Sequence, residues 1–366
     1  MDIVIVGAGL TGACSALVLT RRGHDVTVIE KGELGQATTA NSGSAILYQT
    51  KETELLVTMT ARGLLLWDAL RAEGLTPFRR DGSHVLFAGA EEEFFAARRA
   101  DFLSGHGVQV ERLDRATLLD QLPGLHADIT GSFHCSADGE TNPLESCIDI
   151  ARAAQRAGAS FIFHDACVAL TFQGDQVRSL RTTSGLTLAA DAVVLAAGHA
   201  TAALAADCDV DLPVYPERGE QLLTYPQPPT LKGRVLSVRY TRGKAKGAFV
   251  GLALGQEPDG RIKIGSTRET GHADLVTSER GRQGLLEELA FCLPQLAKLP
   301  IERHTVGIRI GSRTGRPIVA RLPGWDGVFV IDGLGGNGVA FAPLVAELAA
   351  DLIDGTADPL HPQLTF

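Results

Sequence analysis

The sequence predicts an α/β fold of two lobes, and three features carry that prediction. Its 366 residues are long for one domain and sufficient for two hydrophobic cores. Near each end, at residues 3–22 and 328–353, a short apolar run is followed by a glycine-rich turn and an apolar helix. Between them, residues 160–189 and 213–266 contain short runs typical of antiparallel strands. We therefore expect a buried parallel sheet with helices and a separate antiparallel sheet.

The first unit is organised around three glycines. Residues 3–6 form a continuous apolar run, as expected of a strand buried on both faces. Gly7, Gly9 and Gly12 follow in G-x-G-x-x-G spacing, and a packed helix and a second strand occupy residues 13–29. This is the order of a Rossmann-type dinucleotide site, in which the glycines allow a tight turn, close approach to a pyrophosphate and close helix–strand packing.

An acidic residue completes this unit. Glu30 follows the second strand, 18 residues after Gly12, at the place where a carboxylate accepts hydrogen bonds from a ribose diol. The pyrophosphate would lie at the helix N-terminus, because free N–H groups and the helix dipole favour negative charge there. The combination predicts a bound dinucleotide. A glycine turn without a ligand is the alternative.

Composition and charge argue against several functions. The net charge is −9, from 34 Lys+Arg and 43 Asp+Glu, whereas nucleic-acid binding needs a basic surface. The first strand begins at Asp2, so no secretory leader is expected. The longest apolar stretch, residues 339–353, contains Glu347 and Asp351 and is shorter than the roughly 20 residues of a membrane span. The six cysteines form no C-x-x-C pair, so we expect no zinc site or disulfides and a cytoplasmic setting.

The remaining elements follow along the chain. Helical patterns predict further helices at residues 52–71, 90–104, 143–156 and 277–293. Short apolar or alternating runs predict strands at residues 84–87, 161–164, 167–172, 177–182, 186–189 and 191–198, those from 161 to 189 forming one antiparallel meander, and residues 213–266 are strand-like throughout. In the last helix we expect Pro343 in the first turn, because an interior proline would cost roughly 3 kcal/mol.

Two segments carry open alternatives. Residues 32–49 are rich in small and polar residues and predict a loop. This loop is either a plain connector or a source of hydrogen bonds to a cofactor, since functional residues concentrate on loops. His199 follows the strand at residues 191–198. We expect it to be a surface histidine at the start of a helix, because no acid–base partner is evident.

These motifs in this order resemble the D-amino-acid oxidase superfamily of FAD-dependent oxidoreductases, particularly its glycine oxidase, sarcosine oxidase and D-amino-acid dehydrogenase branches. The resemblance covers essentially the whole chain. It rests on VIVGAGLTG with Glu30, ATTANSG at 37–43, DGETNP at 138–143, VVLAAG at 193–198, YPERGEQL at 215–222, GRIKIGST at 260–267, GIR at 307–309, GRP at 315–317 and VFVIDGLGGNGVAFAP at 328–343.

The resemblance implies a division of the chain. Residues 1–82, 143–210 and 305–366 would form a discontinuous Rossmann-type FAD-binding domain. Residues 83–142 and 211–304 would form an antiparallel-sheet α+β substrate domain stacked over the flavin.

The same resemblance implies the cofactor contacts. The ADP half of FAD would be held by Gly7, Gly9, Leu10, Thr11, Gly12, Glu30 and Lys31, with Val168 at the adenine and Ala197 and Gly198 near the pyrophosphate. Thr38, Thr39, Asn41, Ser42, Gly335, Gly336, Asn337 and Gly338 would line the flavin and its ribityl chain, and Arg309 would lie beside it. N–H groups at a helix start would stabilise the negative charge of reduced flavin. No cysteine or histidine stands where covalent members attach flavin, so the FAD would be noncovalent.

Arg309 matches the position at which this family holds the substrate carboxylate. A guanidinium group suits that role because it stays charged and donates two parallel hydrogen bonds. The alternative is that Arg309 pairs with a neighbouring acid. Arg218 is expected to be structural. The family's usual tyrosine near the substrate has no clear counterpart, and Phe249 and Tyr240 are the candidates in its place.

The activity implied is oxidation of the C–N bond of a small amino acid or N-substituted amino acid to an imine, which water converts to a keto acid and an amine. The electron acceptor would be oxygen or an electron carrier, with no nucleic acid or membrane span involved. Three alternatives stay open: a 2-hydroxy-acid dehydrogenase, an enzyme that uses nicotinamide alone, and a non-catalytic flavin-binding subunit of an oxidase complex. A homo-oligomer is equally compatible.

Overall fold

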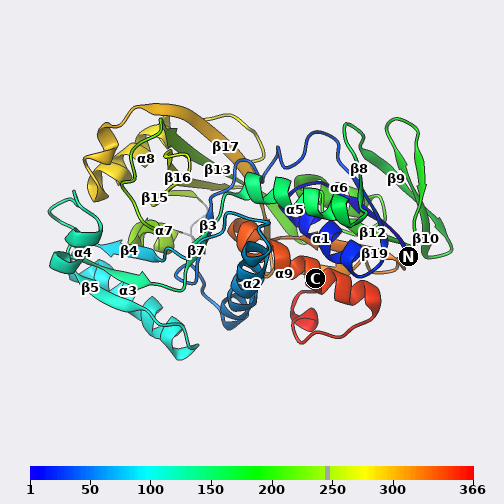
Figure 1. The fold of residues 1–366 in the computed structure, drawn as a ribbon, viewed down its shortest axis with the longest axis horizontal. Coiled ribbons are helices and arrows are strands. Elements are labelled where there is room, and N and C mark those ends of the chain that lie inside the picture. Colours follow the sequence, from blue (N-terminus) through cyan, green and yellow to red (C-terminus); the bar gives the residue numbers. More distant parts are fainter. Residues whose placement is uncertain (244–247) are drawn as a thin grey trace.

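The computed structural model describes residues 1–243 and 248–366. These residues form two lobes side by side along the longest axis, with helix α2 (Glu54–Ala72) between them (Figure 1). Both chain ends lie in the lobe that holds strands β1 (Asp2–Val6) and β19 (Val328–Asp332). The predicted two-lobed α/β fold is confirmed.

The lobe with the chain ends is built on a mostly parallel sheet. Within the described residues its strands run in the order β18-β19-β12-β1-β2-β8. All neighbouring pairs are parallel except β18 and β19. The remaining strands are β2 (Asp25–Ile29), β8 (Ser160–Ile162), β12 (Ala192–Leu195) and β18 (Ile318–Arg321). The carboxyl ends of β2, β1, β12 and β19 therefore follow one another along one edge.

Both faces of this sheet are buried, which explains why its strands are continuous apolar runs. Ile3 and Ile5 of β1 pack into the core beneath α1, α5 and α9, whereas Val4 and Val6 pack into a second core beneath α6 and the antiparallel sheet β11-β10-β9. The covering elements are α1 (Leu10–Arg21), α5 (Pro143–Ala157), α6 (Thr201–Ala206), α9 (Gly338–Asp354), β9 (Cys167–Gln173), β10 (Gln176–Thr182) and β11 (Thr187–Ala189).

The expected meander is wrong in its first strand. The strand predicted at residues 161–164 is β8, and it joins the parallel sheet beside β2 instead of pairing with β9. It follows α5, which packs against α1 on one face of the sheet, so the chain returns to the edge of the sheet parallel to β2. There Glu30 N–H donates to the Ile162 carbonyl (2.9 Å), and the edge of β2 is covered.

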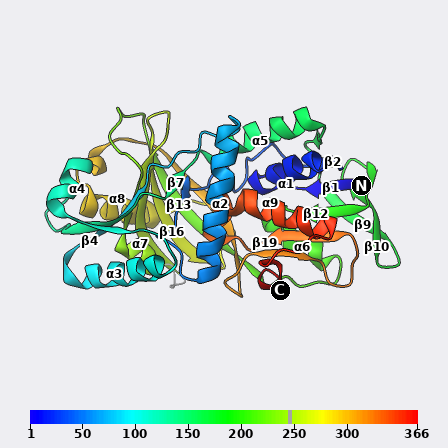
Figure 2. The same cartoon turned by 60° about the horizontal axis from the view of Figure 1, so that its bottom comes forward.

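Pro343 does not lie in the first turn of α9, contrary to our expectation. The helix begins at Gly338, so Pro343 is an interior residue. A proline leaves the carbonyl four residues earlier without its helical donor. Here that carbonyl belongs to Val339, and the Trp67 indole Nε1–H of α2 donates to it at 3.1 Å. The tertiary contact between α2 and α9, which Figure 2 shows in the middle of the molecule, thus offsets the helical bond that Pro343 removes.

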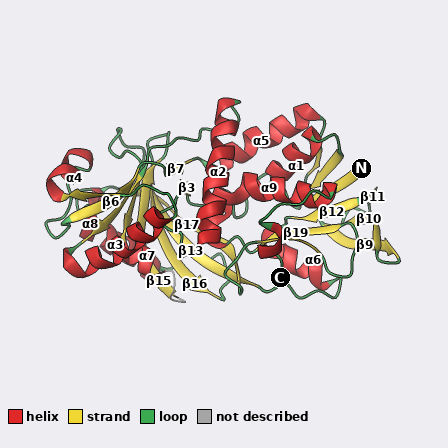
Figure 3. Cartoon of the chain, turned by 90° about the horizontal axis from the view of Figure 1, so that it is seen from below, coloured by secondary structure: helices red, strands yellow, loops and turns green. Residues whose placement is uncertain are grey.

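The other lobe is built on a large, mostly antiparallel sheet, and Figure 3 shows its strands gathered away from α1, α5 and α9. Within the described residues the strand order is β17-β13-β16-β15-β14-β4-β6-β5. The bounds are β4 (Ser83–Phe87), β5 (Glu111–Asp114), β6 (Gly131–Cys135), β13 (Val214–Thr224), β14 (Arg234–Ser237), β15 (Ala248–Gln256), β16 (Ile262–Thr270) and β17 (Ile301–Ser312). Its flanking helices are α3 (Gly89–Gly105), α4 (Arg115–Gln121) and α8 (Glu279–Cys292), and a short ladder of β3 (Ala45–Ile46) with β7 (Gly139–Glu140) lies between the lobes.

The stretch at residues 213–266 is not strand-like throughout. A short helix, α7 (Val238–Gly243), separates β14 from β15. Val238 and Thr241 are buried at a spacing of three residues, which suits one face of a helix. Ser237 begins this helix by accepting a hydrogen bond from the Tyr240 N–H at 3.2 Å.

Helix α9 together with the 3₁₀ turn η3 (Gly335–Asn337) is longer than its apolar sequence run indicated. The continuous helical stretch Gly335–Asp354 has 20 residues, and its most apolar 18-residue window has a mean hydropathy of 1.3, enough by length and composition to cross a membrane. However, 67% of its most apolar window is buried inside the protein. Its composition is that of a core helix packed between α1, α2 and the sheet.

Candidate cofactor and substrate site

A cavity of about 600 Å³ lies between the carboxyl edge of the parallel sheet and the large antiparallel sheet. Most of the residues expected to contact a cofactor or substrate line this cavity. They are Gly7, Gly9, Leu10, Thr11, Glu30, Lys31, Thr38, Thr39, Asn41, Ser42, Val168, Ala197, Gly198, Tyr240, Arg309, Gly335, Gly336 and Gly338. Gly12, Asn337 and Phe249 stand behind the lining in the part of the chain that the structure describes.

The glycine turn is a cradle formed by close backbone contacts. Gly7 has φ of +108°, and a Cβ there would lie 2.5 Å from the Ala196 carbonyl oxygen at the end of β12. A Cβ on Gly12 would lie 1.9 Å from the Gly7 carbonyl oxygen, so α1 packs directly against the turn. Gly9 caps α1 without a side-chain hydrogen bond, and the first residues of the helix, Leu10 and Thr11, line the cavity.

Glu30 is held at the edge of the cradle by two backbone bonds. Its Oε2 accepts from Ala8 N–H at 2.8 Å and its Oε1 from Gly32 N–H at 2.9 Å. A carboxylate has further lone pairs on both oxygens. Glu30 can therefore hold the glycine turn and still accept hydrogen bonds from a ribose diol.

The loop at residues 32–49 contacts both lobes. Thr38 Oγ1 donates to the Ile308 carbonyl of β17 at 2.9 Å, and Ser42 Oγ donates to the Thr38 carbonyl at 2.7 Å. The Asn41 amide donates to the Ala37 carbonyl at 3.0 Å, and Thr39 Oγ1 accepts from Leu10 N–H at 3.0 Å. These side chains chiefly fix the loop, so what the loop presents to a ligand is its backbone and the remaining oxygen lone pairs.

The second glycine turn presents η3 and the start of α9 to the cavity. Gly335, Gly336 and Gly338 line it, as expected. Asn337 turns away, because its Oδ1 accepts a 2.5 Å hydrogen bond from the buried Lys51 ammonium. The sequence motif could not reveal this, since Lys51 is remote in the sequence.

Arg309 lies on β17 with its guanidinium group directly over Gly219 of β13. A Cβ on Gly219 would be 2.1 Å from Arg309 Nη1, so only glycine leaves room for this side chain. Arg309 donates long hydrogen bonds to the Thr267 carbonyl (3.4 Å) and to Ser266 Oγ (3.2 Å). Burial, and the nearby Arg268 guanidinium, lower the pKa of Arg309 from its usual value. The Arg309 cation is therefore incompletely satisfied within the protein.

The two guanidinium groups of Arg268 and Arg309 lie beside a single carboxylate, that of Glu217, so one positive charge is not neutralised. Glu217 forms a close ion pair with Arg268, at 2.6 Å between Arg268 Nη1 and Glu217 Oε2. Its other oxygen, Oε1, lies 3.7 Å from Arg309 Nη1, too far for a hydrogen bond. Two guanidinium groups thus share one carboxylate. This arrangement suits an incoming carboxylate better than the alternative that Arg309 is fully paired.

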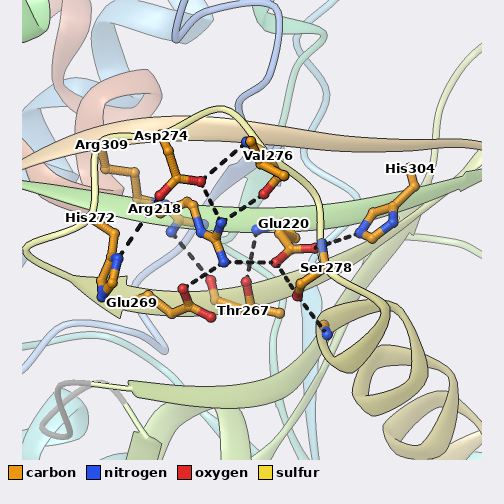
Figure 4. Close-up of polar contacts among 11 residues, drawn as sticks. Arg218, Glu220, Thr267, Glu269, His272, Asp274, Val276, Ser278, His304 and Arg309 are labelled. Atoms are coloured by element: carbon orange, nitrogen blue, oxygen red, sulfur yellow. Dashed lines mark hydrogen bonds and ion pairs between the residues drawn. The ribbon is translucent and has the colours of Figure 1, made fainter.

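Arg218 is structural, as expected. Figure 4 shows its guanidinium group surrounded by Asp274, Glu269, Glu220 and the Val276 carbonyl. The contacts to Asp274 Oδ1, Glu269 Oε2 and the Val276 carbonyl measure 2.6, 2.7 and 2.7 Å. Side chains alternate along β13, so Arg218 points away from the face on which Gly219 and Arg309 meet.

The two candidate aromatic residues take different places. Tyr240 of α7 lines the cavity, and its electrostatic interaction with Arg309 partly offsets the lowering of the Arg309 pKa by burial. Phe249 packs behind it, with its ring 5.9 Å from that of Tyr240 and 5.6 Å from the Arg268 guanidinium carbon. Tyr240 is therefore the better placed of the two to contact a substrate.

Several cavity residues were not found from the sequence. Lys263 Nζ donates to the Ser42 carbonyl at 3.1 Å and lies 3.6 Å from Glu257, and burial lowers its pKa. His199 lies in the turn η1 (Gly198–Ala200) and is exposed, as expected, although it also lines the cavity. There its Nε2 lies 3.2 Å from Lys31 Nζ, and burial and Lys31 lower its pKa. Asp332 also lines the cavity. In the sequence, Lys263 is only a strand residue, His199 only follows a glycine, and Asp332 is only an acid at a strand end. None of these features alone predicts a cavity residue.

The fold and the cavity define a nucleotide-binding α/β protein in which a second sheet covers the ligand site. Comparison with known families gives a more specific identification. Residues 2–352 match the model of the FAD dependent oxidoreductase family named DAO, and the chain belongs to that family. Its cofactor is FAD, so the alternative of nicotinamide alone is set aside.

The relatives that the chain resembles are similar over nearly their full length. This chain is 28% identical to glycine oxidase of Geobacillus kaustophilus, and the alignment covers 96% of this chain and 93% of that protein. It is 27% identical to one of the opine oxidase subunits of Rhizobium meliloti, covering 90% and 87%. The crystal structure of the Geobacillus kaustophilus glycine oxidase superposes with a TM-score of 0.89 at 28% identity over 100% of this chain and 98% of that one.

The cavity fits the FAD that this family uses. The cradle at Gly7 and Gly12 leaves space that a Cβ would fill, and the N-terminus of α1, which lines the cavity, suits a pyrophosphate. Glu30 stands at the ribose position beside it. At the far end, the turn η3 before α9 lines the cavity and contacts β17 of the antiparallel sheet.

Proposed function

We propose that this protein is an enzyme that oxidises the C–N bond of a small amino acid or N-substituted amino acid. The product imine is hydrolysed by water to a keto acid and an amine. The observation that carries the proposal is Arg309, a largely buried guanidinium group (23% exposed) with one uncompensated positive charge beside the FAD cavity. A substrate carboxylate is the anion that such a group recognises through two parallel hydrogen bonds.

We assign the cofactor contacts as follows. The ADP half is held by the turn Gly7–Thr11, by Gly12 through packing, and by Glu30, Lys31, Val168, Ala197 and Gly198. The flavin half lies against Thr38, Thr39, Asn41 and Ser42 and against Gly335, Gly336 and Gly338. Asn337 acts indirectly, by fixing this second turn through Lys51. The FAD is noncovalent.

The chain's own residues bind and orient the substrate. Arg309 fixes the carboxylate and thereby the position of Cα, and Gly219 gives the guanidinium group its place. Tyr240 closes the same end of the cavity, while Lys263 contributes a second buried cation. When bound, FAD supplies the two-electron acceptor for the hydrogen on Cα. A neutral substrate amine needs no strong protein base, so orientation and water exclusion do most of the work.

A panel of substrates tests the choice between amines and hydroxy acids. The holoenzyme is mixed anaerobically with glycine, sarcosine, D- and L-amino acids, an opine and the matching 2-hydroxy acids, and the flavin absorbance is followed. We expect amines to bleach the flavin, because the site holds a carboxylate next to an oxidisable Cα. Bleaching by hydroxy acids alone would instead assign a 2-hydroxy-acid dehydrogenase. Oxygen, admitted afterwards, shows whether it or an electron carrier is the acceptor.

The alternative of a non-catalytic subunit is kept because two similar proteins are each named a subunit of an oxidase. The isolated chain would then bind FAD without turnover and would need a partner chain. The arrangement of Arg309 and Tyr240 at the FAD cavity favours a catalytic chain. Turnover by the purified chain excludes the non-catalytic alternative, whether it is monomeric or a homo-oligomer.

The division of the chain into domains and its compartment remain proposals. We assign residues 1–82, 143–210 and 305–366 to the FAD-binding domain and residues 83–142 and 211–304 to the substrate domain. Strand β17, which crosses the boundary at residue 305, pairs with β13 of the substrate domain along most of its length. A cytoplasmic location is proposed from the scattered cysteines, whose thiols are all free.

Gly219→Ala is expected to reduce kcat/KM at least about 10-fold, chiefly through KM, with FAD still bound. The added methyl group would overlap Arg309 Nη1 and displace the guanidinium group. Steady-state kinetics together with the flavin absorption spectrum check this result. Normal kinetics with a normal spectrum would show that the position of Arg309 over Gly219 is not needed.

A further inference from the structure

Asp332 has an unsatisfied carboxyl oxygen in the wall of the FAD cavity. It is the last residue of β19, is 4% exposed and lines the cavity. Its Oδ1 accepts from Gly333 N–H at 2.8 Å. Among the described residues, no donor reaches its Oδ2. Burial raises the pKa of this carboxyl to about 7.

Buried polar groups without a partner are costly, so an exception calls for an explanation. The neighbouring strand ends offer no donor side chain. Ile318 is the register partner of Asp332 on β18, and Ala196 and Ala197 follow β12 on the other side. The missing partner is therefore best sought in the ligand that fills the cavity.

The order of the strands indicates which part of the ligand reaches Asp332. Glu30 follows β2, Gly7 follows β1, Ala197 follows β12, and Asp332 ends β19, so the four lie in sequence along the carboxyl edge. Adjacent strands are about 4.8 Å apart. With the adenosine ribose at Glu30 and the pyrophosphate at Gly7, the part beyond the pyrophosphate lies toward Asp332. In FAD that part is the ribityl chain, whose polar groups are hydroxyls.

We propose that Asp332 binds a ribityl hydroxyl of FAD and so contributes to holding the flavin half of the cofactor. A hydroxyl can donate to an ionised carboxylate or accept from a protonated one, so the contact does not depend on the charge of Asp332. The proposal rests on FAD binding alone and not on the choice of substrate. Its failure would therefore leave the proposed reaction untouched.

The test measures FAD and ADP binding separately. Holoenzymes of the native protein, Asp332→Ala and Asp332→Asn are diluted, and FAD release is followed by flavin fluorescence to obtain the Kd. ADP, which lacks the ribityl chain, is then titrated as a competitor of FAD. We expect Asp332→Ala to raise the Kd for FAD about 10- to 100-fold, the range for a hydrogen bond to a charged group. The inhibition constant of ADP, once corrected for the changed affinity of FAD, should stay the same. Asp332→Asn keeps an acceptor oxygen and should lie between the two.

A matched control is available just before the same strand. Asp326 is exposed just before the opposite end of β19, so Asp326→Asn should bind FAD and ADP like the native protein. An unchanged Kd for FAD in both Asp332 variants would overturn the proposal. An equal loss of FAD and ADP affinity would also overturn it, because the defect would then lie in the ADP half or in the fold. Should Asp332→Ala fail to fold, Asp332→Asn decides by the same two constants.

Discussion

Arg309→Ala is expected to reduce kcat/KM at least about 100-fold while FAD stays bound. Two hydrogen bonds to a substrate carboxylate are lost, each worth about 1.5–3 kcal/mol when the partner is charged. Glu217 also loses one of its two cationic neighbours, which leaves less positive charge at this end of the cavity. Steady-state kinetics with the preferred substrate and titration of a carboxylate inhibitor measure the effect.

Two further variants separate binding from structure. Arg309→Lys keeps the charge without the planar fork and should recover only part of the loss. Arg316→Ala removes an exposed arginine from the turn after β17 and should behave like the native protein. If Arg309→Ala retains FAD and shows an unchanged KM and inhibitor affinity, the carboxylate role is removed.

Gly12→Ala is expected to weaken FAD binding at least about 10-fold and to lower the free energy of unfolding by about 3 kcal/mol. A Cβ at this position would lie 1.9 Å from the Gly7 carbonyl oxygen, and backbone on both sides must shift to admit it. The shift would move the helix N-terminus away from the pyrophosphate. Thermal unfolding and FAD release upon dilution report the two effects separately.

Gly105→Ala is the matched control for this substitution. A Cβ on Gly105 meets nothing within 4 Å, at the end of α3 in the other lobe. FAD affinity and stability should be close to those of the native protein. Native-like FAD binding by Gly12→Ala would refute the idea that this contact shapes the cradle.

The parts of the fold that follow local rules could be predicted from the sequence. The unit from β1 to Glu30 and the strand, turn and helix near the other end are short-range patterns, and the structure contains both. What could not be predicted depends on tertiary contacts. The pairing of β8 with β2 depends on the packing of α5, and the interior Pro343 is tolerated because Trp67 of α2 takes the freed carbonyl.

The candidate site divides in the same way. Motifs identified the glycine cradle, Glu30 and Arg309, because each residue type has a distinct chemical role at a fixed place in its motif. Motifs did not reveal which side chains lie behind the cavity lining: Asn337 is held by Lys51, and Phe249 packs beside Tyr240 and Arg268. They also did not reveal Asp332, whose significance depends on burial and an absent partner.

The most direct test of the proposed reaction is the product balance of a single anaerobic turnover. The holoenzyme is mixed with the amino acid that bleaches it fastest, quenched with acid, and analysed for keto acid, amine or ammonia, and the extent of flavin bleaching. Oxidation of the C–N bond predicts equal amounts of keto acid, released nitrogen and bleached flavin. Bleaching without release of nitrogen, or bleaching obtained only with 2-hydroxy acids, would contradict the proposed reaction.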